Sequence, residues 1–142
     1  MLKTFVLLTI PLLLPAAGVA QASGDSLLLQ CGFSAPSTSC IYKVSIIQLL
    51  ARPEVFDGKR VQVEGYIHLE FEGQGIYLHQ EDEQRSLYRN GLWVEFQTDS
   101  TYKTPCQDRY VLIEGTFRAR HHGHMGLWGG AITSITRCMP WG

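Results

Sequence analysis

The feature that most constrains the fold of this chain is a period-two alternation that begins after Gly58. In "RVQVEGYIHLEF", residues 60–71, apolar side chains occupy almost every second position, and polar or amphipathic side chains lie between them. Such alternation is typical of a β-strand that buries one face. The side chains predicted to point into a core are Val61, Val63, Ile67, Leu69 and Phe71.

Four further segments along the rest of the chain also have the pattern of a β-strand. Residues 76–80 and 92–96 each predict a strand, and residues 109–120 and 127–138 predict two more, joined by a histidine-rich tip. The inward side chains of the two shorter strands are Ile76, Leu78, Leu92, Val94 and Phe96. Glycines inside the strand patterns, such as Gly65 and Gly115, indicate the bulges and sharp coiling of a small closed barrel. A β-sandwich needs about seven strands, and seven are hard to find here.

One short helix is predicted before these strands. Ser45 and Gln48 have the spacing of a capping box, which places a helix from Ile46 to near Ala51. The helix should stop there because Pro53 disfavours helical geometry at the residue before it. Residues 53–56 are predicted to add one loose turn, residues 81–91 are predicted to be a charged connection, and the polar link 97–108 shows no helical pattern.

Two segments of the chain resemble known proteins. "LLARPEVFDGKRVQVEGYIH" resembles the opening of OB-fold domains, and the tail, "YVLIEGTF" with "HGHMGLWGGAITSITR", is similar to a group of small secreted bacterial proteins of no established activity. The resemblance covers residues 44–137 and implies an all-β, five-stranded OB-like barrel with one short N-terminal helix. A typical OB fold carries a helix between its third and fourth strands, and this chain departs from that pattern.

The N-terminal residues predict secretion to the periplasm or outside the cell. Lys3, an apolar stretch and the small residues Ala20 and Ala22 form the three regions of a signal peptide over residues 1–22. An uncleaved anchor is the alternative, but the apolar stretch is short for a membrane span, so no span is expected after cleavage. The chain after residue 22 is predicted to comprise an N-terminal segment, 23–43, and the barrel domain, 44–142.

Four cysteines in an oxidising compartment favour two disulfides over a zinc site, since no Cys-x-x-Cys pair is present. If the last two strands pair about a tip near Gly123, Cys106 and Cys138 lie almost opposite each other. The second disulfide, Cys31–Cys40, then follows by elimination and closes the N-terminal segment on itself.

The outward face of the predicted barrel suggests a ligand surface. Its candidate ligand-binding residues are Tyr66, His68, Tyr77, His79 and Trp93, and the OB comparison places the histidine tip at the rim. A tight turn at Gly73 would set His68 opposite His79, with Glu70 nearby, in an arrangement that could hold zinc or copper.

The tip itself, "HHGHM", is the second candidate metal site. His121, His122 and His124 are imidazole ligands suited to zinc or copper, and Met125 is a soft ligand suited to Cu(I). The alternatives are a structured polar turn, with Met125 folded back onto the barrel, and a pH-sensitive element.

These features favour binding over catalysis. The common hydrolase, protease and phosphate-loop motifs are absent from the sequence, and no cysteine is left over as a nucleophile. The formal net charge of −1 and the glutamates among the outward aromatics exclude a general nucleic-acid binder. The prediction is therefore a non-catalytic module that binds another protein or a saccharide, with a zinc- or copper-binding protein as the alternative and no signal for an oligomeric state.

Overall fold

The computed structural model describes residues 29–30, 40–97 and 103–142. The strands are β1 (Leu29–Gln30), β2 (Ile41–Lys43), β3 (Arg60–His68), β4 (Gly75–Tyr77), β5 (Gly91–Val94), β6 (Arg109–Arg118) and β7 (Ala131–Pro140). The helices are α1 (Ile46–Ala51), α2 (Pro53–Phe56), α3 (Gln80–Gln84) and α4 (Lys103–Cys106), with 3₁₀ turns η2 (Tyr88–Asn90) and η3 (His124–Gly126). The predicted signal peptide and Cys31 lie outside the described residues. No helix in the described segments is long and apolar enough to cross a membrane.

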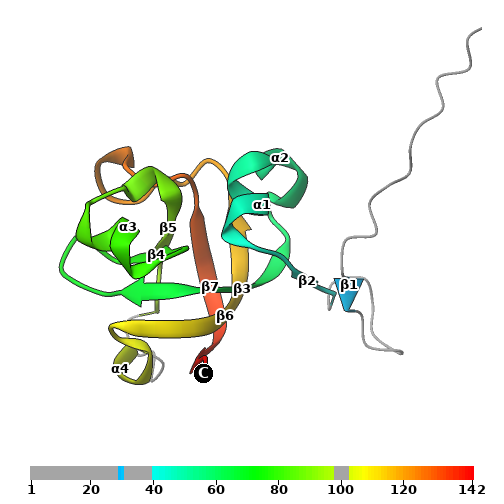
Figure 1. The fold of residues 1–142 in the computed structure, drawn as a ribbon. Helices are drawn as coiled ribbons and strands as arrows, with labels where there is room; N and C mark the ends of the chain where they lie inside the picture. The colour runs from blue at the N-terminus through cyan, green and yellow to red at the C-terminus, as the bar shows by residue number, and fades with distance from the viewer. Residues whose placement is uncertain (1–28, 31–39, 98–102) are drawn as a thin grey trace, which may run out of the picture.

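Five of the strands form a closed barrel in the order β3–β4–β5–β7–β6, and β6 pairs back onto β3 to close it (Figure 1). All pairings around the barrel are antiparallel except β5 with β7, which is parallel. This arrangement confirms the all-β class and is compatible with an OB-like small barrel. The short strands β2 and β1 extend the same sheet from the side of β3.

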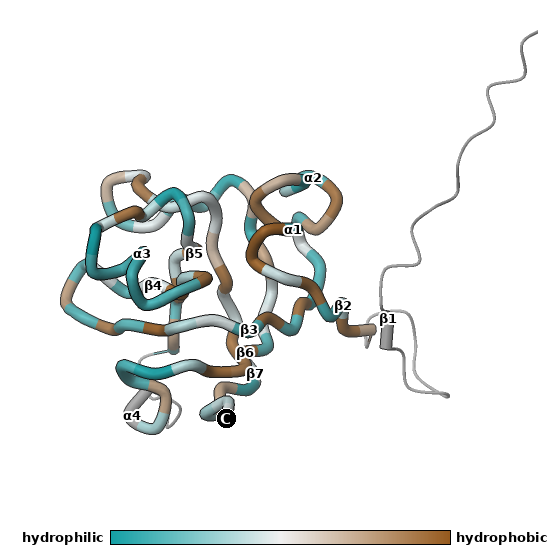
Figure 2. The backbone as a smooth tube through the Cα atoms, in the orientation of Figure 1, coloured by the Kyte–Doolittle hydropathy of each residue, from teal (hydrophilic) through white to brown (hydrophobic). Residues whose placement is uncertain are grey.

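The core is built from the inward positions of the barrel strands, as the alternation predicts. Val61, Val63 and Ile67 on β3 are fully buried, as are Leu92 and Val94 on β5. Figure 2 shows hydrophobic residues concentrated on α1, whereas α3 is hydrophilic. The prediction that Phe71 points into the core is wrong. Strand β3 ends at His68, and Phe71 lies in the following loop with 91% of its surface exposed.

Helix α1 begins at the predicted capping box. The Ser45 hydroxyl accepts a hydrogen bond from the Gln48 backbone N–H at 3.2 Å, and Gln48 Oε1 accepts one from the Ser45 N–H at 2.8 Å. The helix buries Ile46 and Leu49 completely. It packs closely on the barrel because Gly65 has no side chain: a Cβ there would lie 2.9 Å from Cδ1 of Ile46. The predicted bounds of α1 and the extra turn α2 are confirmed.

Helix α4 corrects the expectation of a helix-free link between β5 and β6. It is a single turn, too short to produce a helical period in the sequence, and it contains Pro105. The disulfide Cys106–Cys138 joins its last residue to β7, with Cα atoms 6.4 Å apart, as predicted. Cys31 is not described, so its pairing with Cys40 stays a prediction.

The register of β3 with β4 differs from the predicted one. Tyr66 pairs with Tyr77 and His68 with Gly75, so His68 does not face His79. The prediction assumed a tight turn at Gly73, but the connection is a longer loop over residues 69–74. The shift keeps each side chain on its predicted face of the sheet but changes its cross-strand partner.

Candidate functional site

The two outward tyrosines of the predicted ligand face are not open to solvent. Tyr66 is 6% exposed and Tyr77 is 1% exposed. The Tyr66 hydroxyl accepts a hydrogen bond from Nε2 of Gln80, at the start of α3, at 3.3 Å. Burial raises the pKa of Tyr77 to about 12, although the Trp128 indole N–H opposes this shift. The expectation of solvent-facing tyrosines is therefore wrong, because α3 and the residues after it cover this side of the barrel.

A cluster of aromatic rings lies between the segment that follows α3 and the histidine tip. Trp128 is 1% exposed and contacts Tyr88 and Trp93, each with ring centroids 4.9 Å apart. Its backbone N–H donates to the His122 carbonyl at 3.1 Å, and its carbonyl accepts from Nδ1 of His122 at 2.9 Å. Since a carbonyl only accepts, His122 must carry a proton on Nδ1. Trp128 thus holds the tip in place, and no motif around it in the sequence predicts this role.

The other two histidines of the tip contact different strands and loops. His121 Nε2 lies 3.5 Å from Oε2 of Glu95, next to β5, and His124 Nε2 lies 3.5 Å from Oε2 of Glu72, in the β3–β4 loop. The Gly123 N–H donates to His121 Nδ1 at 3.1 Å, which leaves the His121 proton on Nε2, facing Glu95. The tip is therefore a structured turn whose imidazoles have three separate partners.

No three His, Cys, Asp or Glu side chains gather to hold a metal ion in the part of the chain that the structure describes. His121, His122 and His124 each point to a different group, and His79 lies exposed at the start of α3, away from His68 in the sheet register. Zinc or copper binding by these histidines stays a prediction, and it would require the tip to rearrange.

The tip and the β3–β4 loop border a small groove, here called the rim groove, with a volume of about 380 Å³. The half-buried Trp93 is one of its lining residues, and Gly123 lies directly against the Trp93 ring: a Cβ on Gly123 would come within 2.6 Å of that ring. The residues that line it are Phe71, Glu72, Gln74, Trp93, Glu95, His121, Gly123 and His124. Trp93 is thus the residue of the predicted ligand face that lines this groove.

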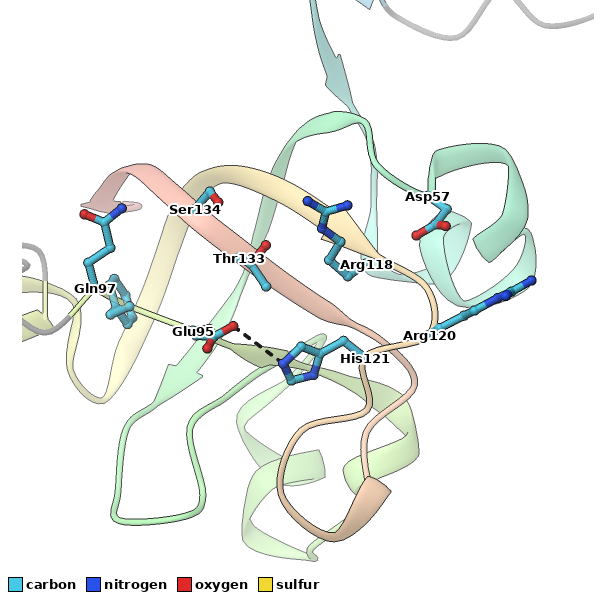
Figure 3. Close-up of a pocket in the computed structure, with 9 residues that line it drawn as sticks. Asp57, Glu95, Gln97, Arg118, Arg120, His121, Thr133 and Ser134 are labelled. Atoms are coloured by element: carbon cyan, nitrogen blue, oxygen red, sulfur yellow. Dashed lines mark ion pairs between the residues drawn. The ribbon is translucent and has the colours of Figure 1, made fainter.

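A second and larger groove, here called the arginine groove, has a volume of about 780 Å³ (Figure 3). Its lining residues are Asp57, Glu95, Phe96, Gln97, Arg118, Arg120, His121, Thr133 and Ser134. In Figure 3, the Arg118 side chain lies between Thr133 and Asp57, while Arg120 points away from the Glu95–His121 pair. Glu95 and His121 line both grooves, so the two are adjacent. Sequence reasoning missed this groove because the segment after β5 contributes to it together with β6 and β7.

His68 lies at the centre of an acidic cluster on another side of β3. Its Nδ1 lies 2.5 Å from Oδ1 of Asp108, and its Nε2 lies 3.6 Å from Glu70 and 3.9 Å from Glu83. Partial burial of the imidazole would lower its pKa, but the hydrogen bond to Asp108 and the negative charges of all three carboxylates outweigh this effect and raise it. Hydrogen bonds from Gln107 and His68 lower the pKa of Asp108. The cluster ties together β3, α3 and the start of β6.

In comparisons with known proteins, no protein-family model, no curated protein and no solved structure matches the chain.

Proposed function

We propose that the protein is a periplasmic or secreted binding module that holds a segment of another protein in the rim groove and catalyses no reaction. The observation that carries this proposal is a pair of exposed apolar side chains on the two loops that border that groove: Phe71 lines it, and Met125 follows His124, which also lines it. Phe71 in the β3–β4 loop is 91% exposed, and Met125 in the β6–β7 tip is 81% exposed. The Glu72–His124 contact joins the two loops beside them.

The backbone at both loops supports a functional role. Glu72 has φ of 62° and Met125 has φ of 53°, the left-handed conformation that residues other than glycine disfavour. Such conformations cost free energy and occur most often at binding and catalytic sites. Water-exposed Phe and Met side chains also gain free energy when a partner covers them.

A protein partner fits this surface better than a saccharide or a nucleic acid. Sugars and bases bind by stacking on open aromatic rings, and here Tyr66 and Tyr77 are buried. One face of Trp93 is already covered by Gly123. Glu72 and Glu95 at the groove would repel phosphates. Phe, Met and Trp are instead enriched in protein–protein interfaces.

Secretion is part of the proposal. The predicted signal peptide supports it, and so does the Cys106–Cys138 disulfide, because such bonds persist in oxidising compartments. Fractionation of cells that express the full chain, with and without residues 1–22, tests this part. The full chain should be found outside the cytoplasm in a shortened form. Equal amounts of both chains in the cytoplasm would contradict secretion.

The binding proposal is tested by replacing Phe71 with the photoreactive residue p-benzoylphenylalanine in the cells from which the protein comes. Irradiation should give one discrete cross-linked product. The matched control places the same residue at Leu87, an exposed apolar position in the link between α3 and η2. Indistinguishable products from the two positions, or none from position 71, would refute the proposal.

A further inference from the structure

The arginine groove lies next to the rim groove, so a segment bound over Phe71 can reach toward β6. Both grooves contain Glu95 and His121, whose side chains lie 3.5 Å apart at the junction. Beyond this junction the lining becomes polar and charged, and it includes the hydroxyl residues Thr133 and Ser134 (Figure 3). A partner with an apolar side chain at one end would thus meet a polar surface at the other.

The charged groups of the arginine groove differ in whether they already have partners. Asp57 accepts a hydrogen bond from the Ala119 backbone N–H at 2.9 Å, and Glu95 contacts His121. Arg118 and Arg120 are both exposed, and within the described segments neither guanidinium group forms an ion pair or a hydrogen bond. The acidic side chains therefore serve the fold, while the two guanidinium groups remain available to a ligand.

We propose that the arginine groove binds a carboxylate of the partner protein, so that the bound segment carries an apolar side chain followed or preceded by an acidic one. This inference rests on the proposed function, since it names the chemistry of the same partner. Arg118 is the main contact, because its side chain lies within the groove between Thr133 and Asp57. A guanidinium binds a carboxylate through two parallel hydrogen bonds, which sets orientation as well as affinity.

A carboxylate fits this groove better than a phosphate does. Asp57 and Glu95 line the same surface, and their negative charges act on any anion held there. A phosphate monoester carries close to two negative charges at neutral pH, whereas a carboxylate carries one. The repulsion is therefore smaller for the carboxylate, and the protein partner supplies this group from an Asp or Glu side chain.

The first test measures the cross-link at position 71 in two charge-matched backgrounds. Arg118→Gln with Arg120→Gln removes both groove arginines, and Arg85→Gln with Arg89→Gln removes two exposed arginines at and after the end of α3. We expect the yield of the cross-linked product to fall about fivefold or more in the first background and to stay unchanged in the second. Unfolding temperatures of both double variants should match that of the parent.

The outcomes of this test separate the inference from the proposed function. A product at position 71 that persists when both groove arginines are replaced overturns the carboxylate site and leaves the binding module standing. Loss of the product in both backgrounds also overturns the inference, because general charge would then explain it. Absence of the product in the parent refutes the proposed function and this inference with it.

A second test uses defined probes. Acetylated, amidated peptides with one Phe and one Asp, separated by one to four glycines, are compared with the same peptides carrying Asn, and NMR signals of the Trp93 and Arg118 side chains report binding. The best Asp peptide should bind about fivefold more tightly than its Asn counterpart, and Arg118→Gln should remove this ratio. Equal affinities, no binding by any Asp peptide, or tighter binding of inorganic phosphate would each overturn the assignment.

Discussion

At the scale of single residues, several glycines of this protein leave space for aromatic rings to pack against the backbone. A Cβ on Gly75 or Gly91 would approach the Tyr77 ring to 2.7 or 2.6 Å, and one on Gly123 would approach Trp93 to 2.6 Å. Contacts this short leave no room for a side chain. The bare backbone at these positions therefore allows the Tyr77 and Trp93 rings to pack directly against the chain.

Gly123→Ala should destabilise the protein more than Gly126→Ala does. Both glycines have positive φ, 64° and 70°, but a Cβ on Gly126 would meet nothing within 4 Å. We expect about 1 kcal/mol of lost stability for Gly126→Ala from the backbone alone. Gly123→Ala should lose about 1–3 kcal/mol more, because Trp93 must move. Urea unfolding measures both losses of stability. Equal losses would show that the Gly123–Trp93 contact contributes nothing to stability.

The His68–Asp108 pair should make stability depend on pH in a defined direction. A raised His68 pKa stabilises the fold below the unfolded value of 6.5, and this gain is lost as the pH rises through the folded value. A lowered Asp108 pKa stabilises the fold above 3.8, and this gain is lost as the pH falls through the folded value. The charge attraction is therefore strongest between these two pH values.

Asp108→Asn should consequently cost most stability between about pH 4 and pH 6.5 and less at pH 8. The cost should not exceed about 1 kcal/mol, because solvent screens this partly exposed pair. Asp57→Asn, a carboxylate that accepts a backbone N–H instead of an imidazole, is the control. Chemical unfolding at several pH values measures the profile, and a cost that grows from pH 6 to pH 8 would contradict it.

At the scale of elements, the short helices depend on the barrel for their position. Helix α3 has no buried residue, and α4 is one turn long. Neither has an apolar face of its own, so each is held by specific contacts: α3 by hydrogen bonds from Gln80 to Tyr66 and Tyr110, α4 by its disulfide to β7. Isolated helices of this length are unstable in water.

Replacing Cys106 and Cys138 with Ala should therefore lower stability by about 3 kcal/mol, because the bridge closes a loop between residues 32 apart. Urea unfolding measures this loss. Dithiothreitol should destabilise the parent by a similar amount and the double variant much less. Equal stability of the parent and the double variant would show that packing alone holds α4 in place.

At the scale of the whole molecule, closure of the barrel brings two distant loops together at one end. The β3–β4 loop and the β6–β7 tip meet through Glu72 and His124, and Glu95 after β5 meets His121. The exposed Phe71 and Met125 lie on these loops and contribute little to the core. The surface proposed for binding is therefore separate from the residues that stabilise the fold.

Phe71→Ser with Met125→Ser should leave the unfolding free energy within about 0.5 kcal/mol of the parent. In the cross-linking assay, with the photoreactive residue moved to Gln74 at the same groove, this double variant should lose the product. Ile47→Ser with Leu87→Ser, two exposed apolar positions elsewhere, is the matched control. A large loss of stability would instead assign Phe71 and Met125 to the fold.

The local structure of this protein follows from short patterns in its amino-acid sequence. The alternation of Val61, Val63 and Ile67 determined the buried face of β3, and Ser45 with Gln48 determined the start of α1. These patterns depend on neighbours only a few residues away, whose directions the backbone geometry sets. The Cys106–Cys138 pairing was also predictable, since a hairpin brings its two ends together.

Which distant residues come into contact depends instead on how the complete barrel folds. The length of the β3–β4 loop set the register that places Tyr66 opposite Tyr77, and the cover formed by α3 and the following turn buried both rings. The Glu72–His124 contact and the position of Arg118 next to Asp57 and Thr133 arise from closure of the barrel. They depend on loop length and on contacts between residues far apart in the chain, which no local pattern of side chains encodes.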